Sequence, residues 1–571
     1  MAPDLRYRPA SELNTEEPLA VTFPVIIAID FGTTFSGCCY KYAHDEEVYD
    51  IVKWPKHSGF YAKVPSLLYY RGRSNRLVDW GEGARRLSLQ PRVDGSLVRR
   101  FKLCLASDYG TEKASDTSFL LPDQSPVDAI ADYLQVFHDY VCEEMEKTGA
   151  NRYGREQYRY CLTVPAIWDD QAKALMREAM VQANIIQESD PPERLVMVTE
   201  PEAAAIYCEK QSRDWNVQDQ ENFMIVDAGG GTVDLIIYHM HWPQGEEKSL
   251  EEITSASGGS CGSSFIDSNM RALLMEKLKL PADVASSCAV ETMMDTFTEK
   301  IKPYFSGNED QFLPVPISLL SHCQGAPSSL IEENGCIRLQ AEELNDKVYN
   351  PVFNQVIDLI EDQLELAGTD VNAMFLVGGF GCSDYLYKIV EERFHSRIPI
   401  IAMAPRGDIA VARGAVYYIT KPKLVSSKIL RYTYGLRTRM VFEEGLDLED
   451  TAVVTSDGVK RCSTRFDVIA SKGQQVQANT KISRRFWAVY PHNTDADLYV
   501  YDGGNSIPRY TTDPGVRKLA KFPIKMPHLE GFTKGDRVDI RIDYIFGLTE
   551  LKAHVFIADR QFEFICSLYK P

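Results

Sequence analysis

The sequence of 571 residues lacks the features that mark membrane, secreted and nucleic-acid-binding proteins. It contains no stretch of about 18 or more consecutive apolar residues, so we expect no membrane-spanning helix. Its first residues, Met1 to Glu17, are polar and contain no apolar signal core, so no secretory signal is expected. Basic residues number 62 against 81 acidic ones, and the formal charge of -19 argues against a general nucleic-acid binder.

Paired cysteine motifs are also missing. The 13 cysteines are odd in number and scattered, Cys38 and Cys39 are adjacent, and no CxxC pair occurs. This usage is typical of reduced, mostly buried thiols, so we expect a cytoplasmic protein that can also be nuclear. His239 and His241 form the only close histidine pair, and with no third ligand in sight we predict no metal site there.

The chain is longer than one hydrophobic core supports, so two or more domains are expected. Residues 1–24 lack periodicity and are predicted to be a disordered tail. Over residues 25–420, short apolar runs alternate with helical patterns, which is typical of an α/β domain. Residues 421–430 (KPKLVSSKIL) are predicted to be a linker, and residues 431–571 a mainly β domain.

The first informative segment is an apolar run, VIIAID, that ends in Asp30 and is followed by a tight turn. Gly32 lets the backbone pass close to a phosphate, and the amides and hydroxyls of Thr33 and Thr34 can donate to its oxygens. Asp30 can hold magnesium through the waters of the ion. One such segment is weak evidence, because a strand followed by Asp and Gly is common.

A second segment, FMIVDAGGGTVDLIIYHM, repeats the arrangement later in the chain. Its apolar strand is followed by Asp227, Gly229, Gly230, Gly231, Thr232 and Asp234. Two hairpins of this kind are what a protein needs to hold the β- and γ-phosphates of one nucleotide from both sides. The pair therefore predicts a nucleotide site.

A third glycine cluster follows a strand in AMFLVGGFGCSDYLYKIV. Gly378 and Gly379 end that strand, Phe380 comes next, and a helix is predicted to begin at Ser383 or Asp384. A flat purine and its ribose can rest on such a backbone, although a Gly-Gly pair at a helix start is not specific by itself.

These three segments occur in the order found in the actin, sugar-kinase and heat-shock-chaperone superfamily. The segment VTEPEAAAIYC, preceded by CLTVPAIWDDQAKALMREAM, resembles the seventy-kilodalton heat-shock proteins, and most of all their divergent branch, in which GGSCG replaces the usual loop. Actin does not carry the EPEAAA segment in this form. The resemblance covers nearly all of residues 25–420. It implies duplicated actin-like ATPase lobes of the ribonuclease H-like type, which bind ATP or ADP with Mg2+ and hydrolyse ATP slowly.

By this resemblance, the hairpin residues contact phosphate, and Asp30 and Asp227 position the magnesium ion and its waters. Glu200 and Asp234 orient the attacking water. Phosphoryl transfer depends mainly on positioning and charge neutralisation, so no nucleophilic side chain is required. The run LVRRFKLCL offers Lys102 as the cation near the γ-phosphate.

The adenosine contacts implied by the resemblance come from FTEKIKPYFSG and two further segments. Glu299 and Lys302 face the ribose, and Ser306 faces the base. Pro303 stands where the chaperones carry an arginine that stacks on the purine, so we expect a weaker preference for adenine. The remaining assignments are Gly262, in a loop over the phosphates, and Asp408, which closes the adenosine pocket.

The C-terminal region follows the strand order of the substrate-binding β-sandwich of the same family. Because the sequence then ends at Pro571, we expect a β domain without a helical lid. Strand alternation is clearest in RVDIRIDY, which places Val538, Ile540, Ile542 and Tyr544 on one face and Arg537, Asp539, Arg541 and Asp543 on the other.

Three functions are compatible with this sequence. The first is an ATP-driven chaperone or polypeptide-binding switch, with a polypeptide client and co-chaperones as partners. The second is a nucleotide-sensing adaptor for one dedicated protein partner. The third is a small-molecule kinase on the same fold, for which we find no sugar site and no catalytic aspartate. None of them involves nucleic acid or a membrane.

Overall fold

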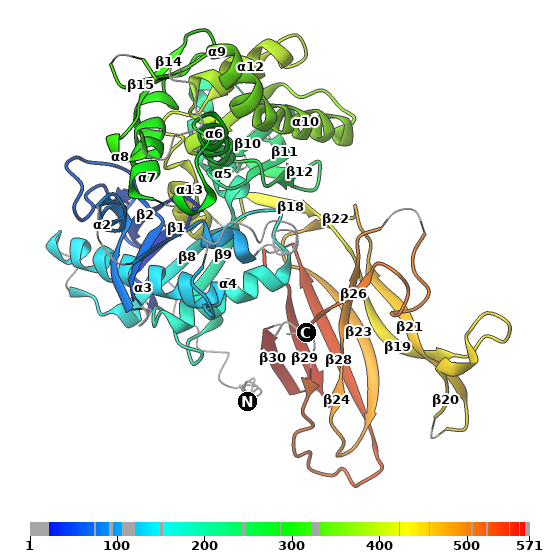
Figure 1. Ribbon diagram of the computed structural model, residues 1–571. Coiled ribbons are helices and arrows are strands. Elements are labelled where there is room, and N and C mark those ends of the chain that lie inside the picture. Colours follow the sequence, from blue (N-terminus) through cyan, green and yellow to red (C-terminus); the bar gives the residue numbers. More distant parts are fainter. Residues whose placement is uncertain are drawn as a thin grey trace.

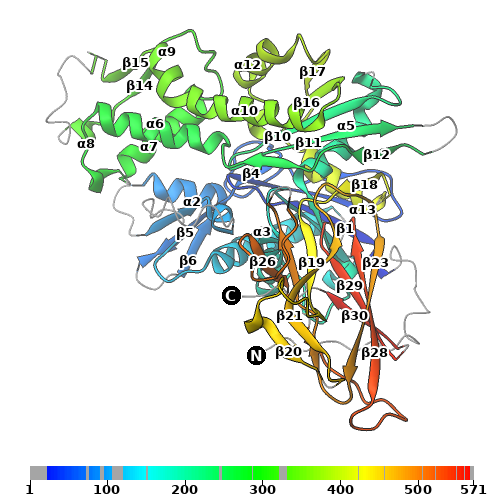
Figure 2. The ribbon, with the colours of Figure 1, turned by 90° about the vertical axis from the view of Figure 1, so that its right-hand side faces the viewer.

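The computed structural model describes residues 22–565 except for 73–75, 91–94, 106–119, 149–151, 216, 243–246, 286, 321–330, 333, 422, 456, 504–505, 521–522, 548 and 559. The predicted tail therefore lies almost wholly outside the described residues. The described chain forms an α/β part (22–424) and a β part (430–565), which lie side by side (Figure 1). Strand β18 (Val425–Ile429) lies where they meet, and Figure 2 shows the same arrangement from another side.

The first sheet of the α/β part has the strand order β3-β2-β1-β8-β9, with β4 beside β2. β1 is buried throughout because its sequence, VIIAID, is apolar up to the final acid. It runs antiparallel to β2 and parallel to β8, which places Asp30 opposite Gly37. The strands are β1 (Val25–Asp30), β2 (Phe35–Tyr42), β3 (Tyr49–Asp50), β4 (Lys63–Pro65), β8 (Tyr158–Val164) and β9 (Leu195–Thr199).

The second sheet has the order β17-β16-β10-β11-β12-β18-β22, with β13 beside β11. It also contains an antiparallel hairpin, β10–β11, whose first strand runs parallel to a later strand, β16. Both sheets thus carry the predicted Asp-Gly-Thr turn at the end of a hairpin. The strands are β10 (Asn222–Ala228), β11 (Val233–His241), β12 (Ser249–Glu252), β13 (Ser257–Gly259), β16 (Ala373–Val377), β17 (Ile400–Met403) and β22 (Gln475–Gln477).

Two helices, α5 (Glu200–Trp215) and α13 (Ala410–Thr420), lie between the two sheets. One face of each sheet packs on them, so that Ile26 and Ala28 of β1 share a core with Phe223 and Ile225 of β10. The opposite faces pack on outer helices. These are α3 (Pro126–Lys147) and α4 (Asp170–Gln182) on the first sheet, and α6 (Ser263–Lys277), α10 (Asn350–Ala367) and α12 (Asp384–Phe394) on the second. This layering confirms the predicted α/β class.

Smaller elements lie beside each sheet, among them the separate sheets β6-β5-β7 and β14-β15, and ion pairs join the two groups. Arg85 contacts Asp295 at 2.6 Å and Glu299 at 2.8 Å, and Arg99 contacts Glu291 at 3.2 Å. The two arginines belong to elements beside the first sheet, and the three acids belong to elements beside the second sheet. The elements are β5 (Leu67–Arg71), β6 (Arg76–Trp80), α2 (Gly81–Ser88), β7 (Ser96–Arg99), a 3-10 turn (Phe101–Leu105), α7 (Cys288–Thr296), a π-helical turn (Phe297–Ile301), β14 (Gln311–Pro314), α8 (Ile317–Leu320), β15 (Cys336–Leu339), α9 (Ala341–Leu344), a π-helical turn (Asn345–Tyr349) and α11 (Gly378–Gly381).

The β part contains a five-stranded sheet, β20-β21-β19-β25-β26, and a four-stranded sheet, β23-β28-β29-β30. The alternation predicted for β28 is confirmed, since Val538, Ile540, Ile542 and Tyr544 are buried in its core. Asp543 departs from the pattern, because it is buried and accepts a hydrogen bond from Ser483. The strands are β19 (Thr433–Val441), β20 (Ala452–Val454), β21 (Lys460–Ala470), β23 (Thr480–Val489), β24 (Thr494–Asp495), β25 (Leu498–Tyr501), β26 (Val516–Ala520), β27 (Pro523–Ile524), β28 (Arg537–Phe546), β29 (Lys552–Ile557) and β30 (Arg560–Ile565).

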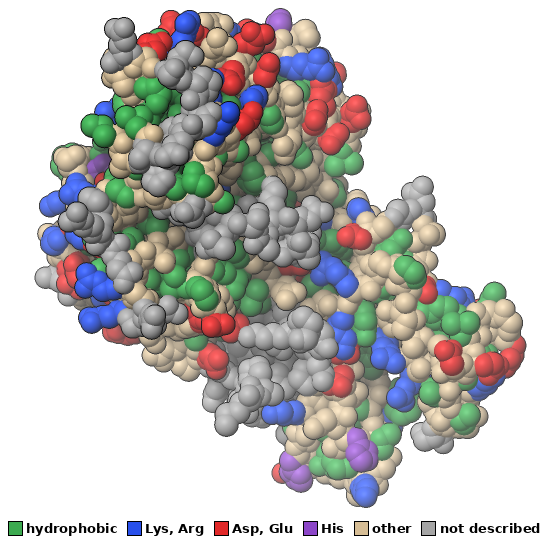
Figure 3. Space-filling model, viewed as in Figure 1, with side chains coloured by type: hydrophobic (Ala, Val, Ile, Leu, Met, Phe, Trp, Pro, Cys, Tyr) green, Lys and Arg blue, Asp and Glu red, His purple; other side chains and the backbone are tan. Residues whose placement is uncertain are grey.

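The surface of the described residues carries both signs of charge. Acidic and basic side chains are interspersed over the face in Figure 3. None of the described helices is long and apolar enough to span a membrane.

The segment predicted as a linker contains a strand of the second sheet. β18 pairs in parallel with β12 and in antiparallel fashion with β22. The side chain of Lys428 is 13% exposed, and its Nζ lies 2.7 Å from Oε2 of the buried Glu202. Glu252 of β12 lies beside this pair, and its Oε2 accepts a hydrogen bond of 2.8 Å from the Ile429 amide. One partly buried cation and two buried carboxyl groups therefore hold β18 in place.

Polar contacts also join the β part to helix α4 and to the segment before it. Arg177 of α4 contacts Glu550 at 2.8 Å, and Lys173 donates a hydrogen bond of 3.1 Å to the Thr549 carbonyl. Arg431, directly after β18, donates a hydrogen bond to the Ala166 carbonyl. The β part is thus fixed to both sides of the site described below, through α4 and through β18.

Burial makes the stability of this junction depend on pH. Burial raises the pKa of Glu252 to about 8, against the attraction of Lys428. When folding raises the pKa of a carboxyl group, unfolding releases a proton at pH values between the unfolded-state pKa and the folded-state pKa. The folded protein therefore becomes less stable as pH rises through this range.

We therefore expect the free energy of unfolding to fall between about pH 5 and pH 8 by up to a few kcal/mol through Glu252. In E252Q, whose amide oxygen can still accept the Ile429 hydrogen bond, this decrement should be absent. Urea unfolding at several pH values measures it, with E251Q, at the half-buried neighbouring position, as the control. Parallel pH profiles for E252Q and the wild type would contradict this account.

Candidate functional site

A cavity of about 600 Å3 lies between the two sheets, where both Asp-Gly-Thr turns open toward each other. Of the residues predicted to bind nucleotide, magnesium or the attacking water, the structure brings most to its wall. These are Asp30, Gly32, Thr33, Thr34, Lys102, Glu200, Asp227, Gly229, Gly230, Gly231, Thr232, Glu299, Lys302, Gly378, Gly379, Phe380 and Asp408. Asp234, Gly262 and Ser306 are not part of the wall.

The two turns approach so closely that side chains are excluded between them. A Cβ added at Gly230 would lie 2.0 Å from Thr34 Oγ1, and one at Gly231 would lie 2.3 Å from Thr33 Oγ1. Gly262 reinforces this contact from behind, since its amide donates to the Gly231 carbonyl at 3.0 Å. Glycine is therefore required here by space, and Gly262 shapes the phosphate loop without facing the cavity.

Four buried carboxylates gather at the ends of these turns: Asp30, Glu200, Asp227 and Asp234. Burial is the main reason why the pKa of Glu200 is raised to about 7, and the charges of Asp234 and Asp30 add to it. Burial and the neighbouring Glu200 raise the pKa of Asp227 well above its usual range. The cluster is thus rich in negative charge that a cation can stabilise.

Asp234 lies behind the wall of the cavity. It is 1% exposed, and one carboxylate oxygen accepts hydrogen bonds from the Ala166 amide at 2.8 Å and the Ile167 amide at 3.2 Å. Burial raises its pKa in spite of these hydrogen bonds. Asp234 therefore ties β11 to the segment that follows β8, and it acts on the cavity through charge.

Two lysines face these acids. Lys102 Nζ lies 2.5 Å from Glu200 Oε1, and it also lies over the rings of Phe31 and Trp168, at 5.6 and 5.4 Å from their centroids. Lys63 Nζ lies 2.7 Å from Asp30 Oδ2. Burial lowers the pKa of Lys63, but Asp30 and the other nearby acids outweigh this and raise it.

Sequence reasoning missed Lys63 because no motif contains it. The available signal is weak: a single lysine within the otherwise apolar run AKVPSLLYY, at a position where a strand is expected to be buried. The position of Lys63 at the cavity follows from the pairing of β4 with β2, which the sequence does not reveal.

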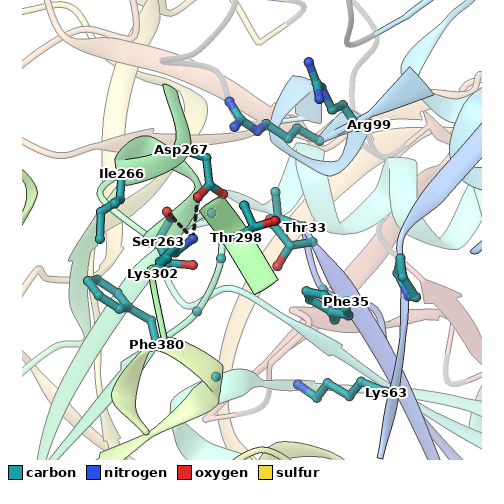
Figure 4. Close-up of a pocket in the computed structure, with 18 of the residues that line it drawn as sticks. Thr33, Phe35, Lys63, Arg99, Ser263, Ile266, Asp267, Thr298, Lys302 and Phe380 are labelled. Atoms are coloured by element: carbon teal, nitrogen blue, oxygen red, sulfur yellow. Dashed lines mark hydrogen bonds and ion pairs between the residues drawn. The ribbon is translucent and has the colours of Figure 1, made fainter. Parts of the chain in front are cut away.

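Among the predicted adenosine residues, Gly378 lies beside Asp227, since a Cβ added there would be 2.6 Å from Asp227 Oδ1. Glu299 and Lys302 line the cavity from the π-helical turn and the residue that follows it. Lys302 donates hydrogen bonds to Asp267 Oδ1 at 2.7 Å and to the Ser263 carbonyl at 2.9 Å (Figure 4). Glu299 pairs with Arg85, so it takes part in the bridge between the two sides. Pro303 lines the cavity, whereas Ser306 is exposed outside it, because the helical turn ends near Pro303 and the chain bends away.

Phe380 belongs to an aromatic wall whose other members, Tyr349 and Phe353, were not predicted from the sequence. The rings of Phe353 and Phe380 are 6.0 Å apart, those of Tyr349 and Phe353 are 5.8 Å apart, and all three residues line the cavity. The Tyr349 hydroxyl is buried and has no hydrogen-bond partner among the described residues. Figure 4 shows Phe380 beside Ile266 and Lys302, so that an apolar surface borders the cation.

Comparison with known proteins identifies the family. The profile of the family described as "Hsp70 protein" matches residues 137–430, a little over half of the chain. The chain belongs to the Hsp70 family. This confirms the resemblance seen in the sequence, and it agrees with the actin-like ATPase fold and with an ATPase at the level of the family.

Individual relatives of this Hsp70 family member span nearly the whole chain. The mouse protein "Heat shock 70 kDa protein 12A" is 24% identical over 95% of this chain and 91% of its own length. Human "Heat shock 70 kDa protein 12B" is 25% identical over 94% of this chain and 89% of its own length. "Chaperone protein DnaK" of Thermotoga maritima is 23% identical, over 87% of this chain and 74% of its own length.

The close approach of the two turns leads to a prediction for nucleotide binding. G230A should weaken ATP binding by about 1–3 kcal/mol, because the added methyl group forces the turns apart at Thr34. G229A should cost less, because a Cβ there would meet only the Thr232 carbonyl, at 3.3 Å. Calorimetric titration with ATP measures both affinities. Equal losses would show that the contact between the turns does not set the affinity.

Proposed function

We propose that the chain binds ATP and ADP in this cavity, hydrolyses ATP slowly, and acts as a chaperone or polypeptide-binding switch. The observation that carries the proposal is the meeting of two Asp-Gly-Thr turns, from two different sheets, on one cavity. Phosphates placed there reach backbone amides and threonine hydroxyls from both sides. We further propose that the two sheets are the duplicated halves of an actin-like ATPase.

In the proposed mechanism the chain positions the phosphates and a water molecule. Thr33, Thr34 and Thr232 hold the phosphate oxygens, and Lys102 supplies a fixed positive charge. Glu200, held by Lys102, orients the attacking water. With a pKa near 7, Glu200 can accept a proton from that water at neutral pH.

The residues present also fit a magnesium ion. The Asp227 carboxylate has no hydrogen-bond or ion-pair partner among the described residues, and three other carboxylates surround it. Within the described chain, no three acids, histidines or cysteines are placed to ligate a metal directly, so these carboxylates suit an ion held through its waters. When bound, Mg2+ supplies charge neutralisation for the phosphates. Asp227 would hold it, with Asp30 beside it.

The adenosine end supports a nucleoside without strong selection for adenine. Glu299 and Lys302 are placed to meet a ribose, and the backbone at Gly378 and Gly379 offers a flat surface. Pro303 supplies no stacking cation, so the aromatic wall is left to contact the base. GTP should then compete with ATP more effectively than in chaperones that carry an arginine at this position.

The β part is proposed to bind extended polypeptide. Val441, Leu446, Leu448 and Val454 are all more than half exposed around β19 and β20. Among the described residues after Lys421 there is no α-helix that covers them. Apolar side chains of a client can bury this surface, but nothing in the described chain slows their escape.

The same exposed surface favours a second candidate function, an adaptor for one dedicated partner. β18 and the contacts of Arg177 hold the β part in a defined position, which suits a fixed partner as well as a variable client. A small-molecule kinase is the third candidate, and a phosphoproduct formed from ATP would reveal it.

Asp227 and Glu200 provide a test of the proposed division of roles. D227N should abolish turnover and bring the affinities for ATP with magnesium and with EDTA close together, because the carboxylate that faces the ion is lost. E200Q keeps a hydrogen-bonding group beside Lys102, so it should still bind ATP, with the same response to magnesium as the wild type, while hydrolysis falls by roughly tenfold or more. Titration calorimetry and single-turnover assays separate the two effects. Retained hydrolysis in E200Q would refute its role.

Peptide dissociation tests the switch against the adaptor. For the switch we expect release within seconds from the full chain, because no described helix covers the exposed surface. Release should be followed by fluorescence with ATP, with ADP and without nucleotide. Binding of many unrelated unfolded peptides supports the switch. Failure to bind any of them, with intact ATP binding, favours the adaptor.

A further inference from the structure

A glycine in β2 allows a lysine to reach the phosphate end of the cavity. Gly37 pairs with Asp30 on one side and with Lys63 on the other, so three neighbouring strands align these residues. Because Gly37 has no side chain, Lys63 can extend across it toward Asp30. A Cβ added at Gly37 would lie 3.1 Å from Lys63 Cγ and 3.6 Å from its Cε.

The ammonium group of Lys63 ends at the carboxylates. Its Nζ lies 2.7 Å from Asp30 Oδ2, while the other Asp30 oxygen accepts a hydrogen bond of 3.1 Å from Thr163. The side chain of Asp30 is 5% exposed and that of Lys63 is 20% exposed, so Lys63 keeps some contact with the cavity. Figure 4 shows it extending from its strand toward the centre of the cavity.

The charges explain why this position matters. Asp30, Glu200, Asp227 and Asp234 outnumber the two ammonium groups, and a nucleotide brings several further negative charges to the same place. A polyanion binds beside buried acids only if cations offset the repulsion. Lys102 pairs with Glu200, whereas Lys63 pairs with Asp30 and supplies the positive charge on that side of the cavity. Unlike a metal ion, it is tethered to the chain and cannot be removed by a chelator.

We propose that Lys63 is a built-in cation that lets the chain hold ADP and ATP without a divalent metal ion. The inference rests on the proposed nucleotide site. It assigns the two sides of the cavity different tasks: Lys63 offsets charge on the side of Asp30, and Asp227 remains available for an ion. Mg2+ then adds no more than about tenfold to the affinity for nucleotide, whereas hydrolysis still needs the metal.

A purely structural role for Lys63 makes a different prediction. If Lys63 only neutralises Asp30, its removal lowers the stability of the first sheet and affects binding equally with and without metal. If it supports the phosphates, its removal weakens binding mainly in the absence of metal, since added Mg2+ can take over the missing charge.

The experiment is a calorimetric titration of the full chain with ADP, in magnesium chloride and in EDTA. We expect the wild type to bind in EDTA within about tenfold of its affinity in magnesium. K63M should lose at least a further tenfold or so in EDTA while it binds nearly normally in magnesium. K63R should retain binding in EDTA. K56M is the matched control, because Lys56 lies shortly before Lys63 and pairs with Asp79 away from the cavity.

G37A provides a second route if K63M does not fold. This variant keeps the lysine, but the added methyl group crowds the aliphatic part of the Lys63 side chain. The affinity of G37A for ADP in EDTA should therefore fall, while that of K56M should not change. Wild-type binding in magnesium that disappears in EDTA would overturn the inference alone. So would K63M binding as tightly as the wild type in EDTA. Absence of ADP and ATP binding in both buffers would overturn the proposed function together with the inference.

Discussion

The concentration of negative charge at the meeting point of the two sheets is the constraint on which the rest of the structure depends. Four buried carboxylates converge there. Each hairpin delivers an acid at the end of its first, apolar strand, the second hairpin adds Asp234 at the start of β11, and α5 adds Glu200 at its first turn. Their mutual repulsion is tolerable only with fixed cations, hydrogen-bond donors and a ligand nearby. Lys63 and Lys102 are those cations. The cations that stabilise the carboxylates are therefore the same ones that are proposed to offset the charge of the nucleotide.

The cavity and the junction with the β part share one helix. Glu200 opens α5 and faces the cavity, while Glu202 lies two residues later and binds Lys428 of β18. Both acids sit on the first turn, where the helix dipole favours negative charge. A change in the position of this turn therefore moves both groups together. A single helical turn therefore connects the cavity wall to β18, without an intervening network of loops.

Local patterns predicted the parts of the structure that depend on local sequence. Both hairpins could be found because an apolar strand, an acid, glycine and threonine follow each other directly, and β28 could be found from its alternation. Lys63 could not, because its partner Asp30 lies on another strand of the sheet and no motif surrounds the lysine. Tyr349 could not, because its ring packs on Phe305 and Tyr385, which are distant in the sequence. Ser306 was expected at the base, but Pro303 near the end of the helical turn changes the direction of the chain. The linker was read as a connector because the partners of β18 lie in β12 and β22, which the segment itself does not reveal.

The pairing of β18 also bears on solubility. As an inner strand it satisfies the backbone amides and carbonyls of β12 on one side and of β22 on the other. If β18 left its place, each of those strands would present a row of unsatisfied hydrogen-bonding groups to solvent, and such open sheet borders recruit strands from other chains. The ion pair of Lys428 with Glu202 therefore helps to keep the border of β12 covered, and any partner that displaces β18 must itself cover that border.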